Sequence, residues 1–315
     1  MLHQKFDVTE RIYRSRFQDW NTRSAVRSKP LPEFVSGDSK LFFTPELVPL
    51  IAHPLIAAQG HEVVHEVLTR HLFGHLNFTD TLENEVVTPV AYMLGRRKLD
   101  FSLAPAMLVD ARKIAVDEMH HALFAAGFVG EISTLSGVDP LPVQRPSFLL
   151  ELDTIKSLHK SRHVPLLMLG FAIISETLIT STLTQVPNDD RVVAGVRTIL
   201  KDHAEDEARH HVYFAEILTT CWPRLTSAQR ALVGPLLPRF ISMFLAPDLL
   251  DVQGCLATLG FSAAVAEQIV EEVYPRERVI SDIRQKADSV VRLMRRAGVL
   301  EDSRTSDSFR QFGLI

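Results

Sequence analysis

The chain has few cysteines, no excess of basic residues and no apolar segment at its N-terminus. Cys221 and Cys255 are the only cysteines among 315 residues, which excludes a disulfide framework. The formal net charge of -4 and the isoelectric point of about 6.4 leave no basic surface for nucleic acid, so we expect no nucleic-acid partner. The sequence MLHQKFDVTERIYRSRFQDW at residues 1–20 lacks the apolar core of a signal peptide, and we expect a cytoplasmic protein.

Glycine is also sparse, and no segment alternates polar and apolar residues as a half-buried strand does. We therefore predict an all-α fold, with a loop at 138–147 and a tail at 303–315. No long polar linker divides the chain, so we predict one domain over residues 1–315. The segments with helical spacing of apolar residues are 60–75, 78–96, 103–130, 148–160, 164–185, 189–219, 227–246, 261–270 and 276–297.

One of these segments has the apolar composition of a membrane span. Residues 164–186, VPLLMLGFAIISETLITSTLTQV, carry Glu176 at their middle and serine and threonine in their second half. A carboxylate at the centre of a span is costly in lipid. We therefore predict a deeply buried helix with one functional acid, and no membrane partner.

The sequence HEVVH at 61–65 is the helix motif with which zinc proteases place two imidazoles and a general base on one metal. An α-helix turns by about 100° per residue, which places Val63, Val67 and Leu68 on the side away from Glu62. Glu62 is therefore predicted to face water, and no third ligand follows it in an obvious position. The motif indicates a solvated helix face rather than a zinc protease.

The same ExxH core recurs in DEARHH at 206–211, where the helical phase is opposite. Glu207 lies on the apolar face of its helix, with His203 four residues before it and His210 three residues after it. Asp202 and Asp206 are predicted to lie on the polar side, from which they could orient ligands only if the helix packs differently. Two imidazoles and a carboxylate on one apolar face are costly to desolvate unless a metal neutralises them.

Three further buried carboxylates are predicted on other helices. Glu118 shares a face with several alanines and with His121 one turn later, and small alanines allow neighbouring helices to approach closely. Glu83 lies on an apolar stripe, whereas Glu85 points about 200° away from it. Glu176 is the acid of the apolar segment; the alternative for it is a buried protonated carboxyl group with a raised pKa.

Together these residues form the ligand pattern of a ferritin-like dimetal bundle, with one Glu from each of two helices and one ExxH from each of two others. We predict a metal-binding bundle over residues 76–220, with further N-terminal helices and C-terminal helices over 227–297. Four carboxylates carry four negative charges, which two divalent ions balance. Carboxylate and imidazole ligands without thiolate suit iron or manganese better than zinc, and we predict two iron ions.

The chain resembles the para-aminobenzoate N-oxygenase family of di-iron enzymes, the AurF-like proteins. The resemblance rests on the ligand spacing, on the phrase LNFTDTLENEVVTPV around Glu83, and on His203, a third histidine that ordinary ferritin-like oxygenases lack. It extends over most of the chain and is strongest from about residue 60 to 215. The predicted metal ligands are Glu83, Glu118, His121, Glu176, His203, Glu207 and His210.

The resemblance implies an O2-dependent monooxygenase that converts an amine to a hydroxylamine, or further to a nitroso or nitro product, in natural product biosynthesis. It also implies an external electron donor, a homodimer, and an amine that is either a small molecule or an amino acid tethered to a carrier protein. A homodimer is further suggested by the apolar helices after residue 227. His203 adds a neutral donor, and we expect it to temper the oxidant.

Two other functions use the same ligands. A di-iron hydroxylase or desaturase would oxidise a C-H bond, and a ferritin-like iron binder would take up iron without turnover. His211 lies close to the phase of Glu207 and is either an outer donor to a ligand or an ordinary helix contact. Arg96, Arg97 and Arg209 could meet a substrate carboxylate but fit solvated surface better, so no substrate-binding residue is assigned.

Overall fold

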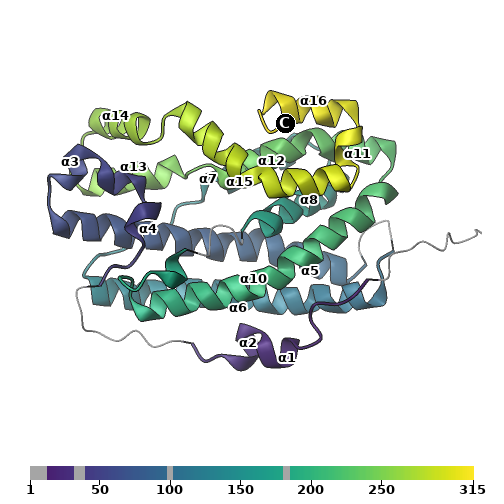
Figure 1. Ribbon diagram of the computed structural model, residues 1–315, viewed down its shortest axis with the longest axis horizontal. Helices are drawn as coiled ribbons and strands as arrows, with labels where there is room; N and C mark the ends of the chain where they lie inside the picture. The colour runs from purple at the N-terminus through teal and green to yellow at the C-terminus, as the bar shows by residue number, and fades with distance from the viewer. Residues whose placement is uncertain (1–12, 32–39, 98–101, 180–184) are drawn as a thin grey trace, which may run out of the picture.

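Figure 1 shows a computed structural model of the chain, which describes residues 13–31, 40–97, 102–179 and 185–315. Within these ranges the fold is all-α, as predicted, and no strand forms. One isolated bridge pairs Leu41 with Val192 and ties the segment after the N-terminal helices to the start of a bundle helix.

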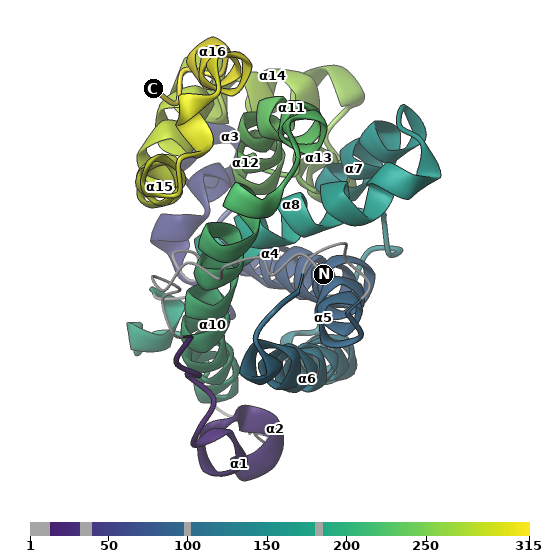
Figure 2. The ribbon, with the colours of Figure 1, turned by 90° about the vertical axis from the view of Figure 1, so that its right-hand side faces the viewer.

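Four long helical segments form the central bundle. The first is continuous over 35 residues and consists of α4 (His61–Leu82), the π-helical turn η3 (Glu83–Val87) and α5 (Thr88–Gly95). The others are α6 (Pro105–Ser136), α8 (Val164–Leu178) and α10 (Ala194–Cys221). The α4–α5 segment packs along α6, and α10 packs against both α8 and α6. Figure 2 shows these helices nearly end-on.

The predicted break between residues 75 and 78 is wrong, because the helix continues through Leu76 and Asn77. The departure from regular α-helix comes later in the segment, in the π-turn that begins at Glu83. Pro89 has no N-H, and its ring would clash with the carbonyl of Glu85 in a regular α-helix. The wider π-turn removes that conflict without ending the helix, and such turns are frequent at functional sites.

The apolar segment that imitates a membrane span is buried inside the protein. Nearly every residue of α8 from Leu167 to Leu178 is inaccessible to solvent, and Glu176 is fully buried among them. The predicted helix ran on to residue 185, but residues 180–184 lie outside the described part of the chain.

Shorter helices flank the bundle on its N-terminal side. Figures 1 and 2 show α1 and α2 beneath α6 and α10, while α3 lies near the start of α4. The flanking and connecting elements are α1 (Trp20–Arg23), α2 (Ala25–Ser28), η1 (Pro45–Leu47), η2 (Pro49–Ala52), α3 (Pro54–Ala57), α7 (Ser147–Ser157), η4 (Ser161–His163), η5 (Val186–Asn188) and η6 (Trp222–Arg224).

The C-terminal third covers the opposite side of the bundle, with α12 packed on α8. Its elements are α11 (Ser227–Val233), η7 (Gly234–Leu236), α12 (Leu237–Leu245), α13 (Leu249–Thr258), α14 (Ala263–Val273), α15 (Arg276–Arg296), η8 (Val299–Glu301) and α16 (Ser303–Gln311). Two of these helices were not predicted. The segment predicted as a tail forms α16, whose polar sequence hides a short buried face of Thr305, Ser306 and Phe309, and α13 follows an aspartate cap directly after Pro247.

The range Ser227–Thr258 is long enough and apolar enough to cross a membrane, judged by length and composition only. A third of its most apolar 18-residue stretch is buried inside the protein. The chain is not one straight helix there. It divides into α11, η7, α12 and α13, and Arg239 in its middle donates to Glu151 of α7 at 2.6 Å. These breaks and this ion pair fit a helical layer packed on the bundle.

Candidate metal centre

Each helical segment of the bundle places one fully buried glutamate in the interior. Glu83 lies at the start of the π-turn, Glu118 on α6, Glu176 on α8 and Glu207 on α10, and all four are completely inaccessible to solvent. The helical phase predicted this for each of them. Glu85, the alternative to Glu83, is exposed and pairs with Arg145.

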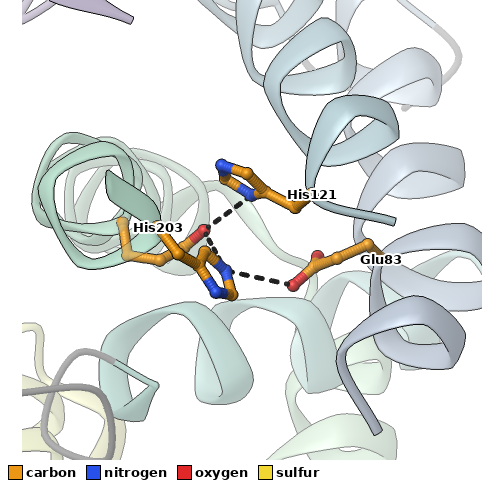
Figure 3. A group of neighbouring side chains, drawn as sticks. Glu83, His121 and His203 are labelled. Carbon is orange, nitrogen blue, oxygen red and sulfur yellow. Dashed lines mark ion pairs between the residues drawn. The ribbon is translucent and has the colours of Figure 1, made fainter. Parts of the chain in front are cut away.

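Three histidines join the glutamates, so the structure brings all seven predicted ligands together. Their donor atoms form two groups in which every atom lies within 4.8 Å of the others. One group contains Glu83, His121, His203 and Glu207, and the other contains Glu118, Glu176, Glu207 and His210. Glu207 belongs to both groups. Figure 3 shows Glu83, His121 and His203 converging from three separate helices.

The two ExxH glutamates lie between the two ExxH histidines. Nδ1 of His121 is 2.9 Å from Glu118 and 3.3 Å from Glu207. Nδ1 of His210 is 2.8 Å from Glu118 and 3.2 Å from Glu207. Each of these two carboxylates therefore reaches both imidazoles, and Glu207 belongs to both donor groups, whereas Glu83, Glu118 and Glu176 belong to one group each.

The far nitrogen of each of these imidazoles faces an aspartate on the other helix. Nε2 of His121 lies 3.3 Å from Asp206, and Nε2 of His210 lies 3.3 Å from Asp117. An imidazole whose Nε2-H donates to a carboxylate presents the lone pair of Nδ1 in the opposite direction, toward the glutamates. The crossed pairs therefore fix which ring nitrogen faces each possible metal position.

The sequence pattern allowed Asp206 an orienting role only if its helix packed differently, and it gave Asp117 no role. Asp206 was predicted on the polar side of its helix but is 1% exposed, and Asp117 was not singled out although it is fully buried. Both precede an ExxH glutamate by one residue, and the repeated DExxH is the signal that could have revealed them. A helical wheel places them about 100° from the glutamate, at the edge of the stripe, where only the packing of α6 against α10 decides burial.

The charges of the site interact strongly. Burial opposes protonation of imidazole, yet the surrounding carboxylates hold the pKa values of His121 and His210 well above their usual range. Burial, and then repulsion between glutamates, raises the pKa of Glu83 and of Glu176 well above the usual value. In the metal-free protein, protons thus balance charges that metal ions would otherwise balance.

The other two glutamates and the third histidine shift the other way. Burial opposes ionisation of Glu118 and Glu207, but the His210 charge and the close approach of the other imidazoles lower the pKa of both. Burial, and then the His121 charge, lower the pKa of His203. A lowered pKa favours a neutral His203 beside Glu207, and a neutral imidazole can act as a metal ligand.

Several polar atoms at the centre are inaccessible to solvent and have no hydrogen-bond partner within the described part of the chain. They include both carboxylate oxygens of Glu83, Glu176 and Glu207, one of Glu118, both nitrogens of His203 and Nδ1 of His210. Buried polar groups are nearly always satisfied, so such a concentration indicates a missing partner. Two divalent ions would satisfy these atoms, and the mixed oxygen and nitrogen donors without sulfur suit iron. The donor set therefore fits a di-iron centre.

The HEVVH motif takes no part in this centre. Glu62 is exposed, as its phase predicted, and the possible metal-binding groups among the described residues do not include His61 or His65. His65 instead contacts the ring of Phe42. The structure gives no support to a zinc protease.

The remaining polar residues singled out in the sequence have ordinary contacts. Arg96 and Arg97 are exposed, and Arg209 pairs with Asp206. Asp202 pairs with Lys29 at 2.7 Å. His211 contacts the backbone of Thr177 on α8, which favours the simple helix contact over a role beside a ligand.

The chain was also compared with known proteins. A search of curated proteins found no match. The family model described as p-aminobenzoate N-oxygenase AurF matches residues 8–298 and so includes the whole bundle and most of the C-terminal layer. The match confirms the resemblance noted in the sequence, and the paired donor groups agree with the iron chemistry of that family. The chain belongs to the p-aminobenzoate N-oxygenase AurF family, and it is an O2-using di-iron N-oxygenase that acts on an amine.

Proposed function

We propose that the seven buried side chains are the ligands of the two iron ions. Glu83, His121, His203 and Glu207 hold one ion, and Glu118, Glu176, Glu207 and His210 hold the other. The observation that carries this assignment is the pair of donor groups that share Glu207 and whose side chains are all buried from solvent. Bound iron supplies the capacity to take up O2 and to deliver an oxygen atom to a nitrogen lone pair.

The protein contributes shielding and orientation. The ring of Phe124 lies 5.7 Å from the rings of both His121 and His203, and Phe17 stacks on His210 at 5.9 Å. These apolar walls exclude water, which strengthens electrostatic interactions inside and protects a reactive oxidant from side reactions. The crossed aspartate pairs hold the imidazoles of His121 and His210 in one orientation.

The electron balance requires a donor outside the chain. Conversion of an amine to a hydroxylamine takes one oxygen atom from O2, and reduction of the other atom to water consumes two electrons and two protons. Each turnover therefore leaves the centre in need of two electrons. We propose an external two-electron donor, and we propose that the amine is either a free arylamine or is tethered to a carrier protein.

The proposed homodimer has a better candidate surface than the C-terminal helices, which pack on the bundle. The face of α6 away from α4 and α10 exposes Val109, Val116, Met119 and Leu123, each at least 45% exposed. They recur at spacings of three, four and seven residues and so form one stripe on the helix. We propose that this stripe pairs with a second copy. A clean monomer in sedimentation at micromolar concentration would contradict it, and Leu123→Glu should dissociate the dimer.

The function is tested by turnover with isotopically labelled oxygen. Protein loaded with ferrous iron, a chemical reductant, p-aminobenzoate and 18O2 should yield a hydroxylamine, nitroso or nitro product that carries the label on nitrogen. A label on carbon would instead support a hydroxylase, and iron uptake without any product would support an iron binder. Glu207→Ala, which removes the donor common to both groups, is expected to abolish turnover.

A further inference from the structure

The crossed aspartates are themselves held by a segment far away in the chain. The N-terminal strap, residues 13–31 with α1 and α2, lies across α6 and α10 (Figures 1 and 2). Nε1-H of Trp20 donates to both oxygens of Asp117, at 2.8 and 2.9 Å, and the hydroxyl of Ser24 donates to Oδ1 at 2.5 Å. The backbone N-H of Ala25 donates to Asp206 at 3.2 Å.

Asp117 depends on these donors more than Asp206 does. Arg209 pairs with Asp206, but among the described residues no lysine or arginine pairs with Asp117. A buried carboxylate is held in one rotation by the donors that reach its oxygens, and leaving those oxygens without donors is costly. Trp20 and Ser24 supply those bonds, and the Oδ2 atom that accepts from Trp20 is also the atom that faces Nε2 of His210.

The strap also contacts His210 directly. The ring of Phe17 lies nearly parallel to the imidazole, at an angle of 15°. The Phe17 carbonyl accepts from the ammonium group of Lys113 on α6 at 2.8 Å, which anchors this part of the strap. The imidazole is thus confined by Phe17 on its face and by Asp117 at its outer nitrogen.

We propose that Trp20 and Ser24 are positioning residues of the metal centre, which act through Asp117 to fix His210 with Nδ1 toward its ion. The inference rests on the two-metal site of the proposed function. It also predicts an asymmetry between the two metal positions. The position of Glu118, Glu176, Glu207 and His210 depends on the strap side chains. At the other position His121 is oriented by Asp206, which accepts from the backbone N-H of Ala25 and, among the described residues, from no strap side chain.

The experiment measures cobalt binding rather than activity. The metal-free full-length chain and the Trp20→Phe, Ser24→Ala and double variants are titrated with Co(II), and uptake is followed by the visible absorption of the ion. The double variant is expected to bind one of two cobalt ions 10- to 100-fold more weakly, the usual range for loss of a partner behind a ligand. The second ion should bind as in the wild type.

Two further variants separate positioning from a general effect on folding. Thr22→Ala removes an exposed hydroxyl of the strap that bonds only the Asp19 backbone, and it should leave both cobalt sites unchanged. Ser24→Thr keeps the hydroxyl and should restore the affinity and absorption bands lost in Ser24→Ala. If the double variant does not fold, the comparison of Ser24→Ala with Ser24→Thr tests the positioning role on its own.

The cobalt titrations test the ligand assignment and the role of the strap separately. Wild-type protein that binds no pair of cobalt ions would contradict the proposed ligands. Wild-type and variant proteins that bind two ions with equal affinities and identical spectra would contradict the role of the strap alone. A uniform fall of the melting temperature of the variants, without a change in cobalt affinity, would show that the strap only covers the bundle.

Discussion

At the scale of single residues, the protein keeps carboxylates where an apolar core would be more stable. Glu176 is fully buried in the apolar helix α8, and neither of its oxygens has a hydrogen-bond partner among the residues that the structure describes. Without metal, burial and repulsion from Glu207 and Glu118 favour its protonated form, so the pKa is raised. Its cost to stability is offset only when ions bind.

The Glu176→Gln variant tests whether the buried carboxyl group lowers the stability of the metal-free protein. The amide resembles a protonated carboxyl group but cannot ionise, so the metal-free variant should melt at or above the temperature of the wild type. The rise in melting temperature on addition of ferrous iron should be reduced, because one ligand is lost. Glu85→Gln, which changes an exposed residue of the π-turn, is the control and should keep the full rise. A metal-free variant that is much less stable would contradict this account.

His203 is the ligand that distinguishes this centre from a bundle with two ExxH motifs alone. Its Nε2 lies 3.3 Å from Glu207 and 3.8 Å from Glu83, but among the described residues no group donates to or accepts from its Nδ1. His203→Ala should leave a folded protein that still binds iron through the other six ligands, with altered product distribution or turnover. His211→Ala should behave like the wild type. Unchanged single-turnover kinetics in His203→Ala would remove this residue from the mechanism.

His71 on α4 makes the stability of the fold depend on pH. Burial lowers the pKa of His71 to about 4, below its unfolded value of 6.5. A depressed folded pKa means that the unfolded chain binds the proton first as the pH falls, so the stability present above pH 6.5 is lost toward pH 4. The shift corresponds to roughly 2 kcal/mol between pH 7.5 and 5.

The His71→Gln variant should therefore show a flatter dependence of unfolding free energy on pH over that range, as measured by urea denaturation of the metal-free protein. His61→Gln, which changes an exposed histidine of the same helix, should keep the slope of the wild type. Equal slopes in all three proteins would show that His71 is not held neutral by the fold.

At the scale of secondary-structure elements, helices with a long apolar stripe were predictable and short capped helices were not. The phases of Glu83, Glu118, Glu176 and Glu207 could be read from the sequence because each lies on a helix with many turns of apolar residues. α13 and α16 were missed, since their positions depend on caps and on neighbouring helices. The π-turn at Glu83 was also missed, because an added residue in a turn leaves no mark in apolar spacing.

One aspartate joins two of these elements. Asp248 caps α13 by accepting from the backbone N-H groups of Leu250 and Asp251, and it accepts from the backbone and the hydroxyl of Ser147 at the start of α7. A single helix cap contributes about 1 kcal/mol. Asp248→Ala is therefore expected to destabilise the protein by about 2 kcal/mol, since two helix starts lose their acceptor.

The matched control for this variant is Asp302→Ala, which removes the cap of α16 alone, where the carboxylate accepts from the N-H of Thr305. This variant should lower the free energy of unfolding, measured with urea, by roughly 1 kcal/mol, half of the loss expected for Asp248→Ala. If the two variants lose the same free energy of unfolding, the hydrogen bonds from Ser147 of α7 to Asp248 do not contribute to stability.

At the scale of the whole molecule, the chain encloses a charged centre between a C-terminal layer and an N-terminal strap. The sequence predicted the bundle and its seven buried residues, because each of them could be placed by the phase of its own helix. It did not predict Asp117, Asp206 and the strap around them, because those contacts join Trp20, Ser24 and Ala25 to helices about a hundred or more residues away. Such pairings depend on tertiary packing, which helical periodicity does not encode.

The most direct test of the di-iron assignment is the metal content and the Mössbauer spectrum of the protein loaded with ferrous iron, before and after exposure to O2. The account predicts two irons per chain that convert together to a spin-coupled ferric pair, with loss of the coupled signal in Glu207→Ala. A single bound ion per chain, or two ions that show no reaction with O2 and no coupling, would contradict it.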